Sequence, residues 1–327
     1  MAVYTKVSDA QFIAHLRHYD IGTFVSATPI KEGVENSNYM LQTTKDKFIV
    51  TLFEKRVREE ELPFFVNLQI ALTERGYCNP APIPTRDNTH IMRLCDRPTL
   101  VVTFLQGDSL RSTILPDHCH QVGAVLAKMH LLGKDIPLHR DNDLSVSGWQ
   151  GLLDKCASPA QGSQYHALYK TLLAQYDEIA PCWPQDLPTS LCHVDLFPNN
   201  VFFHDGQLCG VIDFYFACTE SCAYDLAITV ISWCFRNDGV RFDLVHAMIN
   251  GYHETRPLDA REIASFVLLL RGAALRFTLT RLHDVLFHPP DAFVEPHDPR
   301  EFACYLEIAC QLEQKDRTID DILGVLA

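Results

Sequence analysis

The sequence contains no Cys-x-x-Cys pair, although 12 of its 327 residues are cysteine. Structural zinc sites are usually built from such pairs. The closest two cysteines, Cys218 and Cys222, lie in an apolar stretch without a second pair to complete a site. Buried or half-buried free thiols in a reducing compartment explain the set better. We therefore expect a cytoplasmic protein.

Long hydrophobic runs and a basic leader are also missing. The N-terminus has no basic region followed by an apolar stretch, and Ser8 and Gln11 instead have the spacing of a capping box that opens a helix. The apolar runs at residues 227–235 and 266–270 are too short to cross a bilayer. The sequence therefore predicts a soluble protein without a membrane partner.

Positive charge is scarce. The chain has 28 Lys and Arg against 41 Asp and Glu, which gives a formal net charge of −13. A nucleic-acid backbone or an anionic membrane surface would be repelled, but a small nucleotide can be held locally by Mg²⁺ and backbone N–H groups. With 47% hydrophobic residues, the chain can bury a substantial core.

The first hundred residues have a mostly β-type pattern. A helix is predicted to follow Ser8 and to end near Asp20, and a second helix is predicted at residues 58–75, before Gly76. Short segments rich in Val, Ile, Phe, Tyr and Thr predict antiparallel strands. These segments are residues 23–30, 37–43, 47–53, 90–94 and 98–103.

From Pro116 onward the pattern is mainly helical. Two short strand pairs are expected, one joining residues 191–193 to 201–204 and one at 208–212. The fold class is therefore α+β, with a small β-rich N-terminal lobe at residues 1–104 and a larger helical lobe at 105–327. Helices are predicted at residues 117–132, 163–179, 223–235, 241–253, 259–282, 299–314 and 318–326.

The segment His193-Val194-Asp195-Leu196-Phe197-Pro198-Asn199-Asn200 carries the strongest chemical signal. Phosphoryl transfer to an alcohol needs a carboxylate near the acceptor hydroxyl and an oxygen ligand for Mg²⁺. Asp195 and Asn200 offer both on one short loop, with Asp195 as the base and Asn200 as a metal ligand. The alternative is an ordinary loop, since Asp and Asn favour turns.

A second carboxylate supports the phosphotransferase interpretation. Asp213 ends the apolar strand Val211-Ile212, thirteen residues after Asn200. A buried charge needs compensation, and a metal ion bridging phosphates would supply it. A helix-capping Asp is the alternative. Upstream, Gly33 to Tyr39 join two predicted strands and could cover a triphosphate, although a plain hairpin turn has the same composition.

These motifs resemble the aminoglycoside phosphotransferase and choline kinase superfamily, whose members are small-molecule relatives of the protein kinases. There the loop commonly reads His-Gly-Asp-x-x-x-x-Asn and is followed by Ile-Asp-Phe or Ile-Asp-Trp. Longer strings resemble the bacterial homoserine kinases of this fold. They are residues 33–39, 51–56, 62–65, 102–105, 195–203, 212–218, 223–227 and 271–277.

The resemblance implies a protein-kinase-like two-lobe fold and transfer of a phosphoryl group from ATP to L-homoserine, with Mg²⁺, a step of threonine synthesis. It implies Asp195 as catalytic base, and Asn200 and Asp213 as metal ligands. The residues implied for ATP are Gly33, Asn36, Ser37, Asn38 and Thr51 for the phosphates and Thr103, Phe104 and Leu105 at the adenine.

One position departs from the superfamily pattern. Thr51 stands where a strand Lys or Arg usually points at the phosphates, so Lys55, Arg56 or the Thr51 hydroxyl with Mg²⁺ would have to substitute. A nucleotide-binding pseudokinase is therefore an alternative, against which the presence of Asp195, Asn200 and Asp213 argues. A kinase for choline, an aminoglycoside or a methylthio-sugar is another.

The acceptor pocket is less defined by sequence. A zwitterionic amino acid needs a cation for its carboxylate and a carboxylate or an aromatic face for its ammonium. Arg271 and Arg276, with Arg281, recur on one predicted helix and are candidates for the first role. Tyr215 and Asp225 are candidates for the second, although Asp225 could equally cap a turn or pair with the catalytic loop.

Overall fold

The computed structural model describes residues 4–30, 36–54, 57–110, 113–288 and 295–314. The chain divides into two compact units. The first unit comprises Met1–Gly107 and Cys209–Tyr215, and the second comprises Asp108–Leu208 and Phe216–Ala327. The chain thus returns briefly to the first unit in the segment that contains Asp213.

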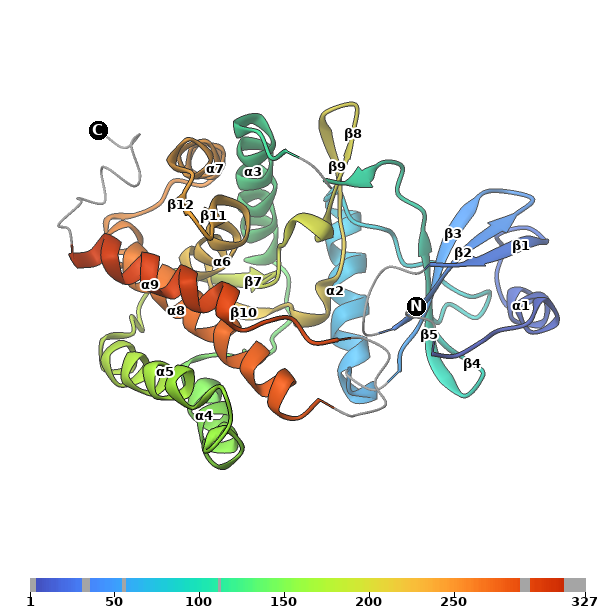
Figure 1. Cartoon of the computed structure of the whole chain (residues 1–327). Coiled ribbons are helices and arrows are strands. Elements are labelled where there is room, and N and C mark those ends of the chain that lie inside the picture. Colours follow the sequence, from blue (N-terminus) through green and yellow to red (C-terminus); the bar gives the residue numbers. More distant parts are fainter. Residues whose placement is uncertain (1–3, 31–35, 55–56, 111–112, 289–294, 315–327) are drawn as a thin grey trace. The chain divides into compact units, whose positions relative to one another are not determined.

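The first unit is built on a five-stranded antiparallel sheet with the order β1-β2-β3-β5-β4 (Figure 1). Its strands are β1 (Phe24–Pro29), β2 (Ser37–Thr43), β3 (Lys47–Leu52), β4 (Ile91–Leu94) and β5 (Arg97–Thr103). Two helices accompany the sheet, α1 (Asp9–Leu16) and α2 (Leu62–Glu74), the latter preceded by the 3₁₀ turn η1 (Glu59–Glu61). The predicted capping box is confirmed, since the Ser8 and Gln11 side chains each bond the other's backbone N–H.

Alternation along β5 assigns one helix to each face of this sheet. Val101 packs into a cluster with Phe12 of α1, whereas Leu100 and Val102 pack into a cluster with Leu62 of α2. Successive strand side chains point to opposite faces, so the apolar run of β5 buries both of them. This explains the uninterrupted apolar run Leu100-Val101-Val102 in the strand.

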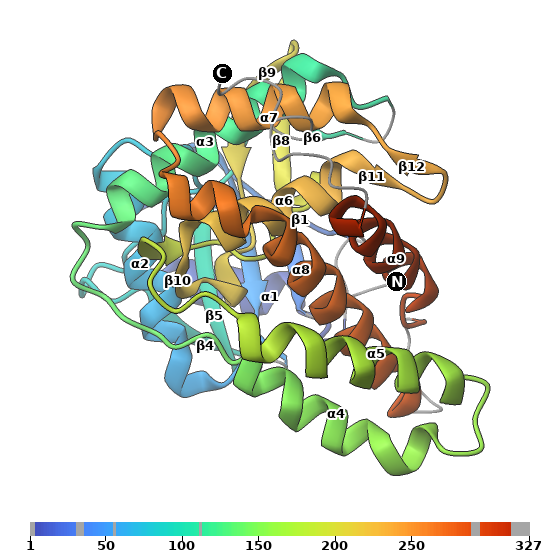
Figure 2. The same ribbon diagram turned by 90° about the vertical axis from the view of Figure 1, so that its left-hand side faces the viewer.

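The second unit is mainly helical (Figure 2). Its helices are α3 (Pro116–Gly133), α4 (Val146–Ala160), α5 (His166–Ile179), α6 (Cys222–Cys234), α7 (Phe242–Thr255), α8 (Ala260–Leu286) and α9 (Arg300–Gln314). Its strands are short, namely β6 (Asp108–Ser109), β7 (Thr189–Cys192), β8 (Val201–His204), β10 (Cys218–Ser221), β11 (Phe235–Arg236) and β12 (Gly239–Val240). Strand β9 (Gln207–Val211) leads from the second unit into the first.

Two glycines set the close contact of α3 with α7. A Cβ atom on Gly123 would lie 2.0 Å from the Met248 carbonyl oxygen, and one on Gly251 would lie 2.0 Å from the His120 carbonyl oxygen. Each glycine therefore gives the opposite backbone room to approach. Helices this close hold α3, and with it His130, firmly in the core of the second unit.

Helix α8 has the length and the composition to cross a membrane, alone among the helices of the described residues. However, 67% of its most apolar window is buried inside the structure. Burial of this kind is expected for the central helix of a helical core. The helix also carries four arginines, which bear on the site described below.

The predicted α+β class, with a β-rich N-terminal region and a helical remainder, is confirmed, and most predicted elements lie within a few residues of the observed ones. The predicted pairing of residues 191–193 with 201–204 is wrong. Strand β7 pairs with β10, whereas β8 lies in a sheet with β6 and β9. Helix α4 was not predicted, and the predicted helix at 318–326 lies outside the described residues.

Candidate active site

The predicted catalytic loop follows β7 and ends in the 3₁₀ turn η3 (Pro198–Asn200). It opens with an unusual backbone conformation, because Val194 has a φ angle of +53°. A β-branched residue rarely adopts this left-handed region, where its side chain is crowded against its own backbone. The conformation persists only if the surrounding structure holds it.

Asp225 of α6 supplies part of that constraint. Its carboxylate is fully buried and accepts the backbone N–H groups of His193 at 2.7 Å and Val194 at 2.8 Å. The sequence interpretation that Asp225 pairs with the catalytic loop thus agrees with these contacts. A charged acceptor makes hydrogen bonds of this kind stronger than a neutral one would.

Asp225 is itself fixed by His130 of α3. The His130 Nε2 lies 2.9 Å from the Asp225 carboxylate, and its Nδ1 lies 2.7 Å from the Tyr252 hydroxyl of α7. Burial alone lowers the pKa of His130, but the negative charge of Cys222 and the Asp225 carboxylate outweigh it and raise the pKa to about 9. Burial likewise raises the pKa of Asp225, yet the contacts with His130 and His193 bring it below its usual range. The two groups therefore form a buried ion pair.

His130, Cys192 and Asp225 also bring three potential metal-ligand atoms within 4.8 Å of one another. Each of these atoms already has a protein partner. Both His130 nitrogens are used as described, and the Cys192 sulfur lies 3.3 Å from the Glu220 carbonyl oxygen, to which it donates. Hydrogen bonds within the protein account for the cluster.

Asn200 closes the other end of the loop. Its side-chain Nδ2 donates to the Asp195 carbonyl oxygen at 2.8 Å. Among the described residues none donates to its Oδ1, the atom that a metal would require. The Trp233 indole N–H also donates to the Leu196 carbonyl at 2.8 Å. The backbone on both sides of Asp195 is therefore anchored by buried side chains.

Asp213 belongs to the first unit and follows β9 with a φ angle of +68°. Asp tolerates this conformation better than most residues do. Burial raises the pKa of the Tyr215 phenol, and the negative charge of Asp213 raises it further. The Tyr215 ring packs edge-on against Phe53 and Phe65, with centroids 5.1 and 5.8 Å away.

Of the residues predicted for the phosphates, Gly33 lies outside the described residues, as do Lys55 and Arg56. The structure brings Thr51 and Asn38 together across β2 and β3, where the Thr51 hydroxyl donates to the Asn38 Oδ1 at 2.8 Å. Ser37 is fully buried, and its hydroxyl donates to Glu54 while accepting the backbone N–H groups of Tyr4 and Thr5. Asn36 lies beside them and accepts the Glu54 N–H.

The predicted adenine segment continues from β5. The Thr103 hydroxyl accepts the Ala81 N–H at 2.9 Å, and the Lys47 ammonium lies 5.6 Å from the centroid of the Phe104 ring. Leu105 packs so tightly on Gly210 that a Cβ there would lie 2.3 Å from it. These contacts hold the segment to the rest of the first unit.

The predicted acceptor residues other than Tyr215 lie in the second unit. Arg271 pairs with Glu178 and Glu313, so its charge is met by protein carboxylates. Arg276 is buried and donates to the Val194 carbonyl at 2.6 Å. Neither His130 nor Tyr252 could be singled out from the sequence, because their partners lie 95 and 122 residues away along the chain.

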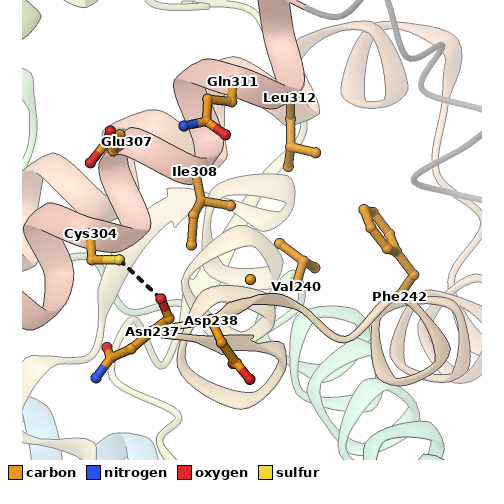
Figure 3. A pocket seen from close by; sticks show the side chains of 10 residues that line it. Asn237, Asp238, Val240, Phe242, Cys304, Glu307, Ile308, Gln311 and Leu312 are labelled. Atoms are coloured by element: carbon orange, nitrogen blue, oxygen red, sulfur yellow. Dashed lines mark hydrogen bonds between the residues drawn. The ribbon is translucent and has the colours of Figure 1, made fainter.

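A pocket of about 400 Å³ lies between α9 and the segment from β11 to α7 (Figure 3). None of the predicted site residues lines it. Its wall is mixed, with Ile308, Leu312 and Val240 beside the polar Asp238 and Glu307. The Cys304 sulfur donates to the Asn237 carbonyl across one end at 3.5 Å.

Comparison with known proteins defines the class of this chain. Residues 26–258 match the model of the family described as "Phosphotransferase enzyme family". The match covers well over half of the chain, and it includes the loop from His193 to Asn200 and Asp213. The chain therefore belongs to this phosphotransferase family.

Within the family, the chain is similar to homoserine kinases over nearly its whole length. It is 46% identical to the homoserine kinase of Parvibaculum lavamentivorans over 303 residues, covering 92% of this chain and 94% of that protein. The homoserine kinase of Rhizobium etli is 44% identical over 304 residues, with the same coverage. These matches confirm the resemblance found in the sequence.

Solved structures support the same fold. The spectinomycin phosphotransferase APH(9)-Ia has a TM-score of 0.70 at 16% identity, covering 95% of this chain and 100% of that one. The choline kinase of Cryptosporidium parvum has a TM-score of 0.70 at 13% identity, covering 98% and 99%. At such low identity the likeness concerns the fold, and it confirms the predicted kinase-like architecture.

Proposed function

We propose that this protein is an ATP-dependent homoserine kinase, which transfers the γ-phosphoryl group of ATP to the side-chain hydroxyl of L-homoserine. The observation that carries the proposal is the 46% identity with homoserine kinases over 92% of the chain. The products are ADP and O-phospho-L-homoserine. Twelve free cysteines suit the reducing cytoplasm in which we place the enzyme.

Asp195 is the proposed catalytic base. Its carboxylate accepts or orients the proton of the acceptor hydroxyl, which makes the oxygen a better nucleophile. Phosphoryl transfer depends mainly on positioning and on charge stabilisation. The anchored backbone on both sides of Asp195 supports this role, because a base held by Asn200 and Asp225 loses little freedom when substrate binds.

Asn200 and Asp213 are the proposed ligands of Mg²⁺. Their donor atoms suit the ion, since Mg²⁺ prefers amide and carboxylate oxygens to nitrogen or sulfur. The Asn200 side chain is oriented through its Nδ2, which leaves its Oδ1 for a metal. When bound, Mg²⁺ neutralises charge on the phosphate oxygens of the nucleotide.

For the nucleotide we propose the phosphate segment with Gly33, Asn36, Asn38 and Thr51, and the adenine segment from Thr103 to Leu105. The bond between Thr51 and Asn38 would orient the Asn38 amide toward a phosphate in place of the usual strand cation. Ser37 is used by three protein groups, so we propose that it shapes the segment rather than binding ATP through its hydroxyl.

Asp225 and Arg271 have their charges met by protein partners, so we propose that both support the structure of the second unit. Tyr215 stays a prediction as part of the wall near the acceptor. Arg276 has a distinct environment and is considered below.

The direct experiment measures ADP release from Mg·ATP with L-homoserine, L-serine, choline and an aminoglycoside as acceptors. Selective turnover of L-homoserine is expected. Preferential turnover of choline or an aminoglycoside would assign a different acceptor to the same chemistry. Binding of ATP without turnover of any alcohol would instead favour a pseudokinase.

A further inference from the structure

Arg276 differs from the other arginines of α8. It is 1% exposed, yet no carboxylate of the described residues pairs with it, and its Nε has no hydrogen-bond partner. Arg261, Arg271 and Arg281 of the same helix each form an ion pair. Burying an unpaired charge is unfavourable, and an apolar side chain of similar length would avoid that cost. We therefore expect the charge of Arg276 to have a specific function.

Among the described residues, Arg276 makes one hydrogen bond, and it is directed at the catalytic loop. The Arg276 guanidinium donates to the Val194 carbonyl oxygen at 2.6 Å and lies 4.6 Å from the centroid of the Phe277 ring. A cationic donor makes a stronger hydrogen bond than a neutral one, and the ring face partly compensates the charge. The Val194 carbonyl belongs to the peptide group that ends at the nitrogen of Asp195. Fixing this carbonyl fixes the orientation in which the chain enters Asp195.

Val194 needs such a constraint. Its φ angle of +53° suits glycine, the residue that commonly stands here in the resembling superfamily, but it is unfavourable for valine. Both polar backbone groups of Val194 are held by side chains of other helices. Asp225 of α6 accepts its N–H, and Arg276 of α8 donates to its C=O.

We propose that Arg276 is a positioning residue of the catalytic loop. Its hydrogen bond to the Val194 carbonyl keeps Val194 in a left-handed backbone conformation that is unfavourable for valine, and so orients the peptide group that leads to Asp195. The inference rests on the proposed role of Asp195 in phosphoryl transfer. It predicts that the need for Arg276 depends on the residue at position 194, because glycine adopts the same conformation without strain.

A competing role for Arg276 is binding of the acceptor carboxylate. That role predicts a raised KM for L-homoserine with little dependence on residue 194. The positioning role predicts a lowered kcat, because a displaced base reacts with an otherwise normally bound substrate.

The experiment compares wild type, Arg276→Met, Val194→Gly and the double variant, with Arg261→Met as matched control. Arg261 lies on the same helix, but its side chain is exposed and pairs with Asp186 and Asp259, neither of which belongs to the catalytic loop. Arg276→Met should lower kcat by about 10²-fold and change both KM values by less than about threefold. In the Val194→Gly background the same substitution should cost about tenfold less. Arg276→Gln, which keeps an N–H donor, replaces the Met variant if that variant does not fold.

Hydrogen–deuterium exchange of the peptides covering residues 190–203 provides a readout that needs no turnover. Arg276→Met should accelerate exchange in this segment, the double variant should restore slow exchange, and Arg261→Met should have no effect. Equal losses of kcat in both backgrounds, or unchanged exchange, would overturn the proposal. A raised KM for L-homoserine with normal kcat would also overturn it. Inactive wild type would refute the proposed function, while the exchange data would still decide the role of Arg276.

Discussion

The His130 Nε2 lies 2.9 Å from the Asp225 carboxylate, and both side chains are completely buried. His130 lies on α3 and Asp225 on α6, 95 positions later in the chain. Asp225 also accepts the N–H groups of His193 and Val194. The pair therefore connects α3, which is packed against α7, to the backbone of the catalytic loop. The precision of the proposed base thus depends on residues that need not touch substrate.

Asp225→Asn tests this dependence. The amide removes the negative charge that His130 and two backbone N–H groups share, so the buried His130 cation loses its hydrogen-bonded carboxylate. We expect the free energy of unfolding to fall by about 3–5 kcal/mol and kcat to fall by about 10²-fold. Denaturant unfolding and steady-state turnover measure the two effects.

Asp243→Asn is the control for that substitution. Asp243 pairs with Arg241 at 2.6 Å on the surface of α7, where an ion pair contributes only about 0–1 kcal/mol. Its loss should leave turnover unchanged. If Asp225→Asn behaves like Asp243→Asn, the carboxylate is not required to hold the loop.

The same ion pair predicts how stability depends on pH. The pKa of His130 is raised to about 9 from an ordinary value of 6.5, so protonated His130 favours the folded state. This contribution is complete below the ordinary pKa and is lost as the pH rises through about 9. The pKa of Asp225 is lowered, so its contribution is present above its ordinary value of 3.8 and is lost as the pH falls through the lowered value.

His130→Gln isolates the alkaline part of that dependence. Wild type should lose stability between about pH 7 and pH 10 more steeply than His130→Gln, which has no group that titrates at this position. Thermal unfolding at a series of pH values gives the comparison. Parallel curves for the two proteins would show that titration of His130 does not contribute to the pH dependence of stability.

Gly123→Ala tests the close contact of α3 with α7. The added Cβ would lie 2.0 Å from the Met248 carbonyl oxygen, so the helices must separate. We expect a loss of about 1–3 kcal/mol in the free energy of unfolding. Gly151→Ala in α4 is the matched control, since among the described residues no atom beyond its own stretch of helix lies within 4 Å of its Cβ position. It should stabilise the protein by about 0.5–1 kcal/mol, and a loss of similar size in both variants would contradict the packing argument.

Asp213→Asn tests the proposed metal ligand without disturbing the backbone, because Asn also tolerates a positive φ angle. We expect loss of Mg²⁺-dependent ATP binding in isothermal titration calorimetry. Asp205→Asn is the matched control, since Asp205 has a φ angle of +49° and a side chain that is 92% exposed. Normal Mg·ATP binding by Asp213→Asn would remove this residue from the metal site.

The sequence predicted the elements of the fold better than their connections. Strands such as β3 and β5 were found because short runs of apolar and β-branched residues mark them. The pairing of β7 with β10 was missed, since the neighbour in the chain, β8, is not the neighbour in the sheet. Helix α4 was missed because Gly148, Gly151 and Pro159, residues that disfavour helix, interrupt its apolar pattern.

The candidate site divides in the same way. Asp195, Asn200 and Asp213 stand in short motifs whose spacing carries chemical meaning, so they could be named from the sequence. The environments of Arg271 and Arg276 could not be predicted, because the local sequence does not distinguish one arginine on a helix from another. Only the folded chain separates an arginine paired with Glu178 from one that holds the Val194 carbonyl.

The central claim is that Asp195 acts as the base in phosphoryl transfer to L-homoserine. The most direct measurement compares wild type with Asp195→Ala in steady-state turnover of L-homoserine, together with the affinity of each protein for Mg·ATP. The account predicts that kcat falls by about 10²–10⁴-fold while Mg·ATP affinity changes by less than about threefold. Turnover of the Asp195→Ala variant at the wild-type rate would contradict it.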